Sequence, residues 1–291
     1  MNVTLEQACA EACTRTGVIF RDVPPDGRFH SADIEGDRSG RGDARIKLFA
    51  DGEGGIVANW KSGETTPFFV SDPLKFSAGE RQQYAALAET RRREYLAAEL
   101  ERHKIKALEF RAWAAHGKDP KRHNYLDAKR LPGIGLRQLN GFLIAPMLDE
   151  NGTVWGGQTI NRDGEKRFFT GAKKHSLFCP IGWKVGEPLK EILIGEGWAT
   201  ACAAHLMFQL PAAAAMDAGN LLPAAKTIRR RYPSVKLIFA SDWDGIGGGI
   251  GFTAACAAAQ AVGNARVIRP ECLDDAHCDF ADNWLELRGA A

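Results

Sequence analysis

Acidic side chains stand directly after two apolar segments that have the length and composition of β-strands. Glu196 lies between two glycines after residues 191–194, and Asp242 and Asp244 follow residues 235–240. If the two strands are neighbours in a parallel sheet, their carboxyl ends meet at one edge, where such sheets bind ligands. Two aspartates that are two residues apart in an extended segment also point the same way. We therefore expect the three carboxylates to converge.

Three clustered carboxylates repel one another, and at least one of their pKa values rises unless a cation compensates them. Oxygen ligands suit a hard cation, so the pattern predicts Mg²⁺ or Mn²⁺ as the cofactor. Such an ion serves phosphate chemistry, because it can bridge protein carboxylates and phosphate oxygens. The alternative is that each acid only caps the helix that follows it, which explains one acid more easily than three.

The elements that would hold these acids alternate between strand and helix from residue 191 onward. Short apolar runs predict strands, and longer Ala- and Leu-rich runs predict the helices between them. The expected strands cover 191–194, 211–216, 235–240 and 265–268, and the expected helices cover 198–208, 222–231, 251–262 and 280–287. This α/β alternation predicts a mainly parallel sheet with helices on both faces.

Three further regions are expected before this C-terminal domain, which we place at 191–291. Residues 1–75 are rich in Gly and Asp and predict a small α+β module with one short helix and a β-hairpin. Residues 76–130 predict a basic helical segment. Residues 131–190 predict a β-hairpin subdomain that packs on the C-terminal domain.

The basic segment has 13 Lys and Arg against 8 Asp and Glu over residues 77–130, whereas the whole chain has a net charge of only +2. Ser77 with Glu80 has the spacing of a helix capping box. The positive charge, which includes Arg91, Arg92 and Arg93, suits a phosphate-binding arm. A solvated helix face is the open alternative.

The composition of the 291 residues, 45% hydrophobic and 25% charged, is that of a soluble globular protein and excludes disordered and fibrous classes. No apolar run is long enough to span a bilayer, and the first residues do not resemble a secretory signal. The seven scattered cysteines favour a reduced, cytoplasmic setting without zinc. Cys9 and Cys13 fit one buried helix face, and the group of Cys272, His277 and Cys278 is weak support for a metal site.

Several of these segments together resemble a known family. The segment Gly195-Glu196-Gly197-x-Ala199-Thr200-Ala201, followed by Asp242-x-Asp244, resembles the Toprim domain of primases, topoisomerases and some nucleases. The closer resemblance is to DNA primases of the plasmid (conjugative) and phage type. It is carried by Asp217-Ala218-Gly219-Asn220-Leu221, by Asp279-Phe280-Ala281-Asp282 and by Lys166-Arg167-Phe168-Phe169-Thr170-Gly171. Segments 26–30 and 59–63 resemble a module near the front of such primases, but the paired cysteines of a zinc module are missing.

The resemblance implies a nucleotidyltransferase that makes short RNA primers on single-stranded DNA, in plasmid or phage replication or in conjugation. It implies ribonucleoside triphosphates as substrates, and a helicase or a single-strand-binding protein as a candidate partner. It also implies that Asp242 and Asp244 hold the metal ion, while Glu196 either assists them or acts as the base. Asp279 and Asp282 are further candidate metal ligands, with helix capping as the alternative for Asp279.

Basic and aromatic residues supply the candidate nucleic-acid contacts. Arg167, Lys173 and Lys174 are expected to bind the triphosphate or the template, and exposed hairpin charges are the alternative. Phe29 and Trp60 could stack on unpaired bases or belong to a small core. A Toprim metal-dependent nuclease and a non-catalytic module that binds single-stranded nucleic acid remain the alternative functions.

Overall fold

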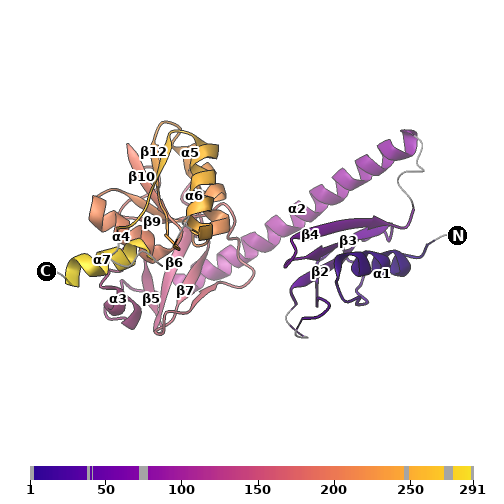
Figure 1. The fold of residues 1–291 in the computed structure, drawn as a ribbon, viewed down its shortest axis with the longest axis horizontal. Helices are drawn as coiled ribbons and strands as arrows, with labels where there is room; N and C mark the ends of the chain where they lie inside the picture. Colours follow the sequence, from indigo (N-terminus) through magenta and orange to yellow (C-terminus); the bar gives the residue numbers. More distant parts are fainter. Residues whose placement is uncertain are drawn as a thin grey trace. The chain divides into compact units, whose positions relative to one another are not determined.

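The computed structural model describes residues 3–37, 40, 42–71, 78–245, 249–271 and 278–289 (Figure 1). The chain divides into two compact units, Met1–Ala98 and Glu99–Ala291. The boundary falls inside the long helix α2 (Ala78–Ala114). This helix lies within the segment 76–130 that was predicted to be helical, and Ser77, the predicted cap, lies outside the described residues.

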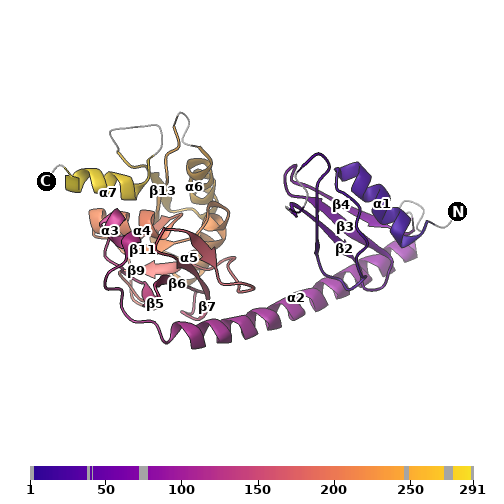
Figure 2. The same cartoon turned by 90° about the horizontal axis from the view of Figure 1, so that it is seen from below.

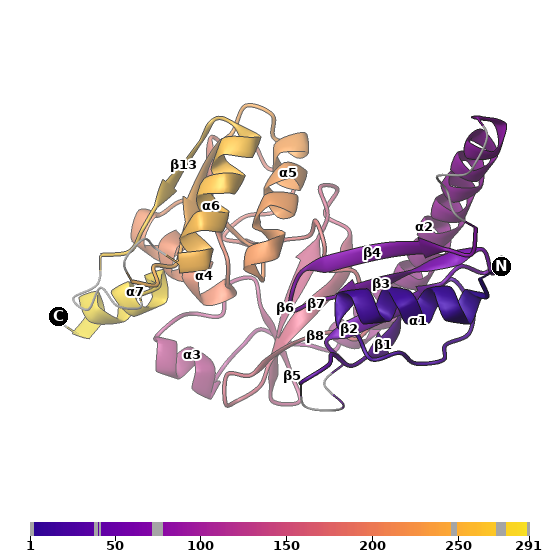
Figure 3. The same cartoon turned by 45° about the vertical axis from the view of Figure 1, so that its right-hand side comes forward.

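The N-terminal unit packs one helix on an antiparallel sheet (Figure 3). Thr4 and Gln7 form a capping box that starts α1, and Gly17 ends it in the left-handed conformation with φ 64°. Cys9 and Cys13 are buried against this sheet, so the predicted buried helix face is confirmed. The unit contains α1 (Leu5–Thr16), β1 (His30–Ala32), β2 (Ala44–Leu48), β3 (Gly54–Asn59) and β4 (Glu64–Phe69), with the strands in the order β1-β2-β3-β4.

Three consecutive arginines of α2 lie near carboxylate groups. Arg91 forms an ion pair with Asp51, while Arg92 and Arg93 lie 4.0 and 3.1 Å from the carboxylate of Glu89. Arg92 and Arg93 are also largely exposed. Arg92 and Arg93 therefore fit the solvated-face alternative, whereas Arg91 is only 19% exposed and packs over the Phe49 ring.

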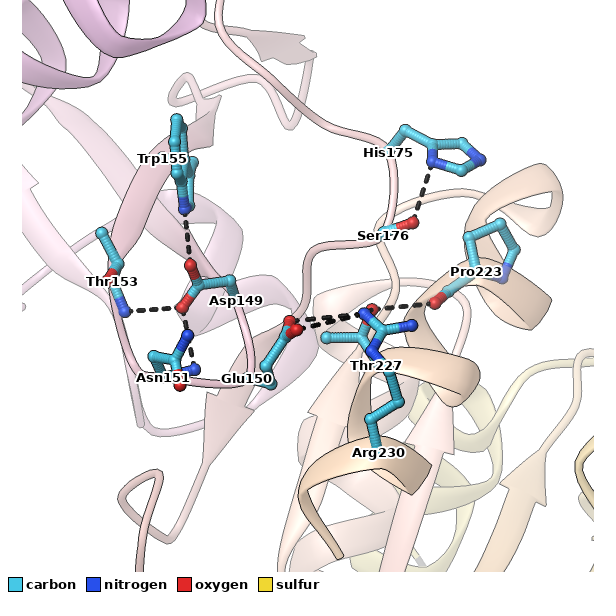
Figure 4. A network of polar contacts seen from close by, with 10 residues as sticks. All are labelled: Asp149, Glu150, Asn151, Thr153, Trp155, His175, Ser176, Pro223, Thr227 and Arg230. Atoms are coloured by element: carbon cyan, nitrogen blue, oxygen red, sulfur yellow. Dashed lines mark hydrogen bonds and ion pairs between the residues drawn. The ribbon is translucent and has the colours of Figure 1, made fainter. Parts of the chain in front are cut away.

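The C-terminal unit contains an antiparallel sheet with strands β5 (Arg137–Leu139), β6 (Phe142–Leu148), β7 (Val154–Ile160) and β8 (Lys166–Phe168), preceded by α3 (Asn124–Lys129). Asp149 closes the turn between β6 and β7. It accepts hydrogen bonds from the backbone of Asn151 and Thr153, each of 2.9 Å, and one of 2.7 Å from the Trp155 indole (Figure 4). Glu150 in the same turn lies 3.3 Å from Arg230, which ties the turn to a helix of the second sheet.

The second sheet has the order β13-β12-β10-β11-β9, in which only β9 is antiparallel to its neighbour. Figure 2 labels three of its strands, β9, β11 and β13. Its strands are β9 (Cys179–Ile181), β10 (Glu191–Gly195), β11 (Ala212–Ala214), β12 (Lys236–Ala240) and β13 (Ala265–Ile268). Its helices are α4 (Trp198–Phe208), α5 (Leu221–Arg231), α6 (Gly249–Val262) and α7 (Phe280–Gly289), with the 3₁₀ helix η2 (Ala218–Asn220). The predicted α/β alternation is confirmed.

Alternate residues of the central strands enter two different cores. Leu193 and Ile238 pack with α4, α7 and the apolar side chains of the antiparallel sheet. Ile194 and Phe239, one residue further along, pack with α5 and α6. Because side chains alternate across a strand, this pattern covers both faces of the sheet, as expected of buried parallel strands.

Across the described ranges, no helix combines the length and the hydropathy that a membrane span needs. Five cysteines there are free thiols: Cys9, Cys13, Cys179, Cys202 and Cys256. Cys278 takes part in a disulfide, which corrects the expectation of reduced thiols throughout. Spacing along the chain does not show which thiols meet in space. Cys272 and His277 lie outside the described residues.

Candidate active site

The two strands that precede the predicted acids are neighbours. β10 and β12 are parallel, and Gly195 pairs with Ala240 at their carboxyl ends. Glu196 and Asp242 therefore leave the sheet at the same edge, as the sequence predicted. Glycine is required at position 195, because a Cβ atom there would lie 2.9 Å from the backbone nitrogen of Ala201.

Asp242 is the most perturbed of these acids. Burial raises its pKa to about 7, and the charges of Asp279 and Glu196 add to that effect. The Thr200 hydroxyl opposes the rise by donating a hydrogen bond of 3.1 Å to Oδ1. Without a cation the Asp242 carboxyl is therefore partly protonated near neutral pH.

Glu196 is also affected by the negative charges of neighbouring acids. Burial raises its pKa, and Asp217 and Asp244 raise it further, while the backbone amide of Ala218 and the charge of Lys166 lower it. The carboxylate is half-buried. Glu196 and Asp242 are thus electrostatically coupled.

Glycines of α6 make room for the acids. A Cβ at Gly251 would lie 3.4 Å from Oε2 of Glu196 and 3.6 Å from Cβ of Asp242, so this residue borders both side chains. Gly249 has φ +69°, and a Cβ there would lie 2.6 Å from Cβ of Asp244. The beginning of α6 consequently depends on residues without a side chain. Residues 246–248 of the glycine-rich stretch lie outside the described residues.

Asp279 and Asp282 cap α7. The backbone amide of Asp282 donates to Oδ1 of Asp279 at 2.8 Å, and that of Asp279 donates to Oδ2 of Asp282 at 3.3 Å. Asp282 also pairs with Lys129 at 3.0 Å. Asp279 interacts with Asp242. Burial raises the pKa of Asp279, and among the neighbouring carboxylates its charge raises the pKa of Asp242 the most.

A short backbone bridge brings Asp279 to this edge. Trp243 and Cys278 exchange two hydrogen bonds of 2.8 Å, which joins the segment after β12 to the segment before α7. The residues on either side of the bridge, Asp242 and Asp279, are therefore held near each other.

The candidate basic residues lie in different surroundings. Lys174 is 3.7 Å from Asp217, and Lys173 lies over the Trp155 ring at 5.2 Å. Asn220 fixes this region, because it bonds the backbone at Ser176 and at Leu177. It thereby holds the segment that carries Lys174 beside η2.

The side chain of Arg167 is 81% exposed and lies 3.7 Å from Glu165. Its neighbour Lys166 is not among the residues predicted from the sequence to bind phosphate. A Cβ at Gly197 would lie 3.9 Å from Nζ of Lys166, and the ammonium lowers the pKa of Glu196. Lys166 shares a strand face with Phe168, which packs on the core, and Arg167 occupies the opposite face. This alternation was the signal that could have identified Lys166.

Within the part of the chain that the structure describes, no three His, Cys, Asp or Glu side chains are grouped closely enough to hold a metal ion. The donor set nevertheless fits a hard cation. Glu196, Asp242 and Asp244 are oxygen donors, and burial together with the charges of neighbouring acids raises the pKa of Glu196 and of Asp242. A bound cation would favour the ionised forms of Glu196 and Asp242.

No protein-family model matches the chain. Its sequence is similar to that of two DNA primases TraC from Escherichia coli. One is 28% identical over 257 residues, which cover 82% of this chain and 17% of that protein. The other is 27% identical over 261 residues, which cover 83% of this chain and 24% of that protein. The chain thus spans a quarter or less of the relatives that it matches.

Solved structures of primases also align with the chain. The primase fragment of the bacteriophage T7 primase-helicase protein aligns with a TM-score of 0.44 and 14% identity, over 60% of this chain and 76% of that one. The RNA polymerase domain of Mycobacterium tuberculosis primase DnaG aligns with a TM-score of 0.33 and 19% identity, over 56% of this chain and 60% of that one. At these scores the structural likeness is weak. The two sequence matches confirm the resemblance predicted from the motifs: the chain is similar in sequence to DNA primases of the TraC type.

Proposed function

We propose that this chain is the catalytic core of a DNA primase and that residues 191–291 form its Toprim domain. The observation that supports this most is the position of Glu196, Asp242 and Asp244 at one edge of a parallel sheet, in a chain similar to TraC primases over most of its length. The division of the upstream chain at residues 75, 130 and 190 belongs to the same proposal.

The proposed reaction is nucleotidyl transfer. The 3′-hydroxyl of the growing strand attacks the α-phosphate of an incoming ribonucleoside triphosphate, and pyrophosphate leaves. Mg²⁺ or Mn²⁺ held by Asp242 and Asp244, with Glu196 and Asp279 beside them, would neutralise phosphate charge and polarise the reacting phosphate. Asp282 contributes less in this scheme, because it is paired with Lys129.

The remaining side chains bind, orient or move protons. Glu196 has a raised pKa, so its carboxylate is a stronger base than an exposed one and can accept the proton of the attacking hydroxyl. The same carboxylate can instead serve as a metal ligand. Lys166 and Lys174 lie beside Glu196 and Asp217 and would bind phosphate oxygens there. Lys173 and Arg167 would contact the template further out.

The partners follow from the reaction. The template is single-stranded DNA, the substrates are ribonucleoside triphosphates, and the setting is plasmid or phage replication or conjugation in the cytoplasm. A helicase or a single-strand-binding protein is the proposed protein partner.

A primer-synthesis assay tests the proposal. The full chain is mixed with single-stranded DNA and labelled ribonucleotides, with Mg²⁺, with Mn²⁺ or with a chelator. We expect short RNA products that depend on the metal and on the template. Metal-dependent nicking of DNA without RNA synthesis would instead support a nuclease. Binding of single strands without either reaction would support a non-catalytic module.

A further inference from the structure

The sheet of the N-terminal unit has two chemically different faces. Ile46 and Val57 lie on the face that α1 covers. Along β2, Arg45 and Lys47 alternate with buried residues and therefore lie on the opposite face. Arg45 pairs with Ala58 of β3, so Trp60, two residues further on, continues the same face.

Each of the two cations on this second face lies beside an aromatic ring. The Arg45 guanidinium lies 3.9 Å from the centroid of the Trp60 ring. Nζ of Lys47 lies 4.2 Å from the ring of Tyr95 and 5.4 Å from the ring of Phe29. Trp60 is 60% exposed and Phe29 is 44% exposed, which excludes the explanation that they are core residues.

Backbone hydrogen bonds fix the guanidinium against the indole. Nη1 of Arg45 donates to the carbonyl oxygens of Gly42 at 2.5 Å and Ala44 at 2.7 Å, and it lies 3.3 Å from the Ser31 hydroxyl. One face of the Trp60 ring is therefore occupied in a fixed arrangement. A ring that is ordered in advance loses less entropy when a ligand stacks on its other face.

We propose that Phe29, Arg45, Lys47 and Trp60 form a binding face for single-stranded nucleic acid. Unpaired bases have flat π-faces that stack on exposed aromatic rings, and the phosphates that alternate with them are attracted by the interleaved cations. A single strand, in which every base is linked to a phosphate, can therefore place bases on the exposed rings and phosphates near the adjacent cations. The proposed binding face belongs to a different unit from the acidic cluster, and binding there does not depend on the proposed reaction.

Binding of a fluorescein-labelled oligothymidylate to the full chain, followed by anisotropy, tests the stacking. We expect Trp60→Ala and Phe29→Ala to weaken binding by roughly 5- to 150-fold each, as is usual for a lost stacking partner. Trp60→Phe should retain most of the affinity because it keeps a ring. Phe142→Ala is the matched control, since Phe142 is another exposed aromatic residue, 42% accessible, in the C-terminal unit.

Salt dependence tests the cations. Arg45→Gln and Lys47→Gln should each reduce the slope of log affinity against log salt by about 0.7. Lys236→Gln, which removes a charge paired with Glu191 at 3.2 Å, should leave the slope unchanged. Ultraviolet cross-linking of an iodouracil-containing strand to the unmodified chain, mapped by mass spectrometry, should mark Trp60 or Phe29 and does not depend on the folding of any variant.

Unchanged affinity and salt slope in these variants, or cross-links confined to the C-terminal unit, would overturn the inference. Equal affinity for duplex DNA would also overturn it, because paired bases cannot stack on the rings. The outcome is separable from the proposed function. If Trp60→Ala loses binding while the unmodified chain makes no primer, the binding face stands and the primase proposal fails. If the unmodified chain makes primers and none of these variants changes binding, the primase proposal stands and the binding face fails.

Discussion

The hydroxyl of Thr200 donates a hydrogen bond of 3.1 Å to Oδ1 of Asp242. The first turn of α4, which follows β10, thereby orients a carboxylate that follows the neighbouring strand β12. The bond favours the ionised form of Asp242 and is one influence that lowers its pKa.

Thr200→Val should shift the pH dependence of primer synthesis to higher pH. The valine side chain has nearly the same shape but lacks the donor, so the pKa of Asp242 should rise above about 7. Thr200→Ser keeps a hydroxyl and should restore the normal profile. The measurement is the rate of primer synthesis against pH at saturating metal. Identical profiles for all three proteins would contradict a positioning role for Thr200.

Asp242→Asn should abolish primer synthesis but stabilise the metal-free fold at high pH. The folded-state pKa is raised from 3.8 to about 7, so the protonated acid is favoured in the folded state. The Asp242 carboxyl group therefore contributes fully to the stability of the fold at a pH below its pKa in the unfolded chain. This contribution is lost as the pH rises through about 7. The melting temperature of the variant should therefore exceed that of the wild type by more at about pH 8 than at about pH 5.

Calorimetry in the presence of a chelator checks this difference. Addition of Mg²⁺ or Mn²⁺ should raise the melting temperature of the wild type and raise that of Asp242→Asn less. Wild-type turnover by Asp242→Asn at saturating metal would reject the proposed site.

Glu196→Gln should lose primer synthesis while its melting temperature stays within a few degrees of wild type. An amide oxygen can still accept the hydrogen bond from the backbone of Ala218, but it carries no charge for a metal ion and takes up no proton. Binding of single-stranded DNA should persist and serves as the control for folding. Full primer synthesis by the variant would refute the assignment. If the wild type only nicks DNA and the variant does not, the nuclease alternative holds at the same residue.

Lys166→Gln should raise the KM for ribonucleotides by roughly tenfold or more, the usual cost of a lost charged hydrogen bond. The ammonium lies near Gly197 and Glu196, where a triphosphate would approach. Arg167→Gln is the matched control on the opposite face of β8 and should change KM less. Steady-state kinetics of both variants shows which of the two side chains binds the triphosphate. A larger rise in KM for Arg167→Gln would contradict the proposed role of Lys166.

Gly251→Ala should keep the fold and increase the metal concentration that activity requires. The added methyl group would stand 3.4 Å from Oε2 of Glu196, an ordinary contact that fills space beside both acids. Alanine also favours the helix by about 0.5–1 kcal/mol, so the melting temperature should not fall. Gly79→Ala in α2, where a Cβ meets nothing within 4 Å, is the control for helix propensity alone. Equal metal titrations for wild type and Gly251→Ala would contradict a site at this place.

Much of the C-terminal sheet could be predicted from the sequence alone, because apolar runs and their breaks are local properties of the chain. The strand before Glu196 and the strand before Asp242 were expected, and the structure has them as neighbours. Since parallel strands end at a common edge, the acids that follow them were identifiable without knowledge of the packing.

Contacts between distant segments were decided only by the tertiary structure. Asp279 reaches Asp242 because Trp243 pairs with Cys278, and nothing in the local pattern indicates that bridge. Lys166 reaches Glu196 because the antiparallel sheet that contains β8 shares a core with the parallel sheet. The exposure of Trp60 could likewise not be predicted from the sequence, since an aromatic residue at a strand end can belong to a core or to the surface. Periodicity determines which face of an element is apolar, whereas packing between elements determines which polar groups meet and which rings stay in contact with solvent.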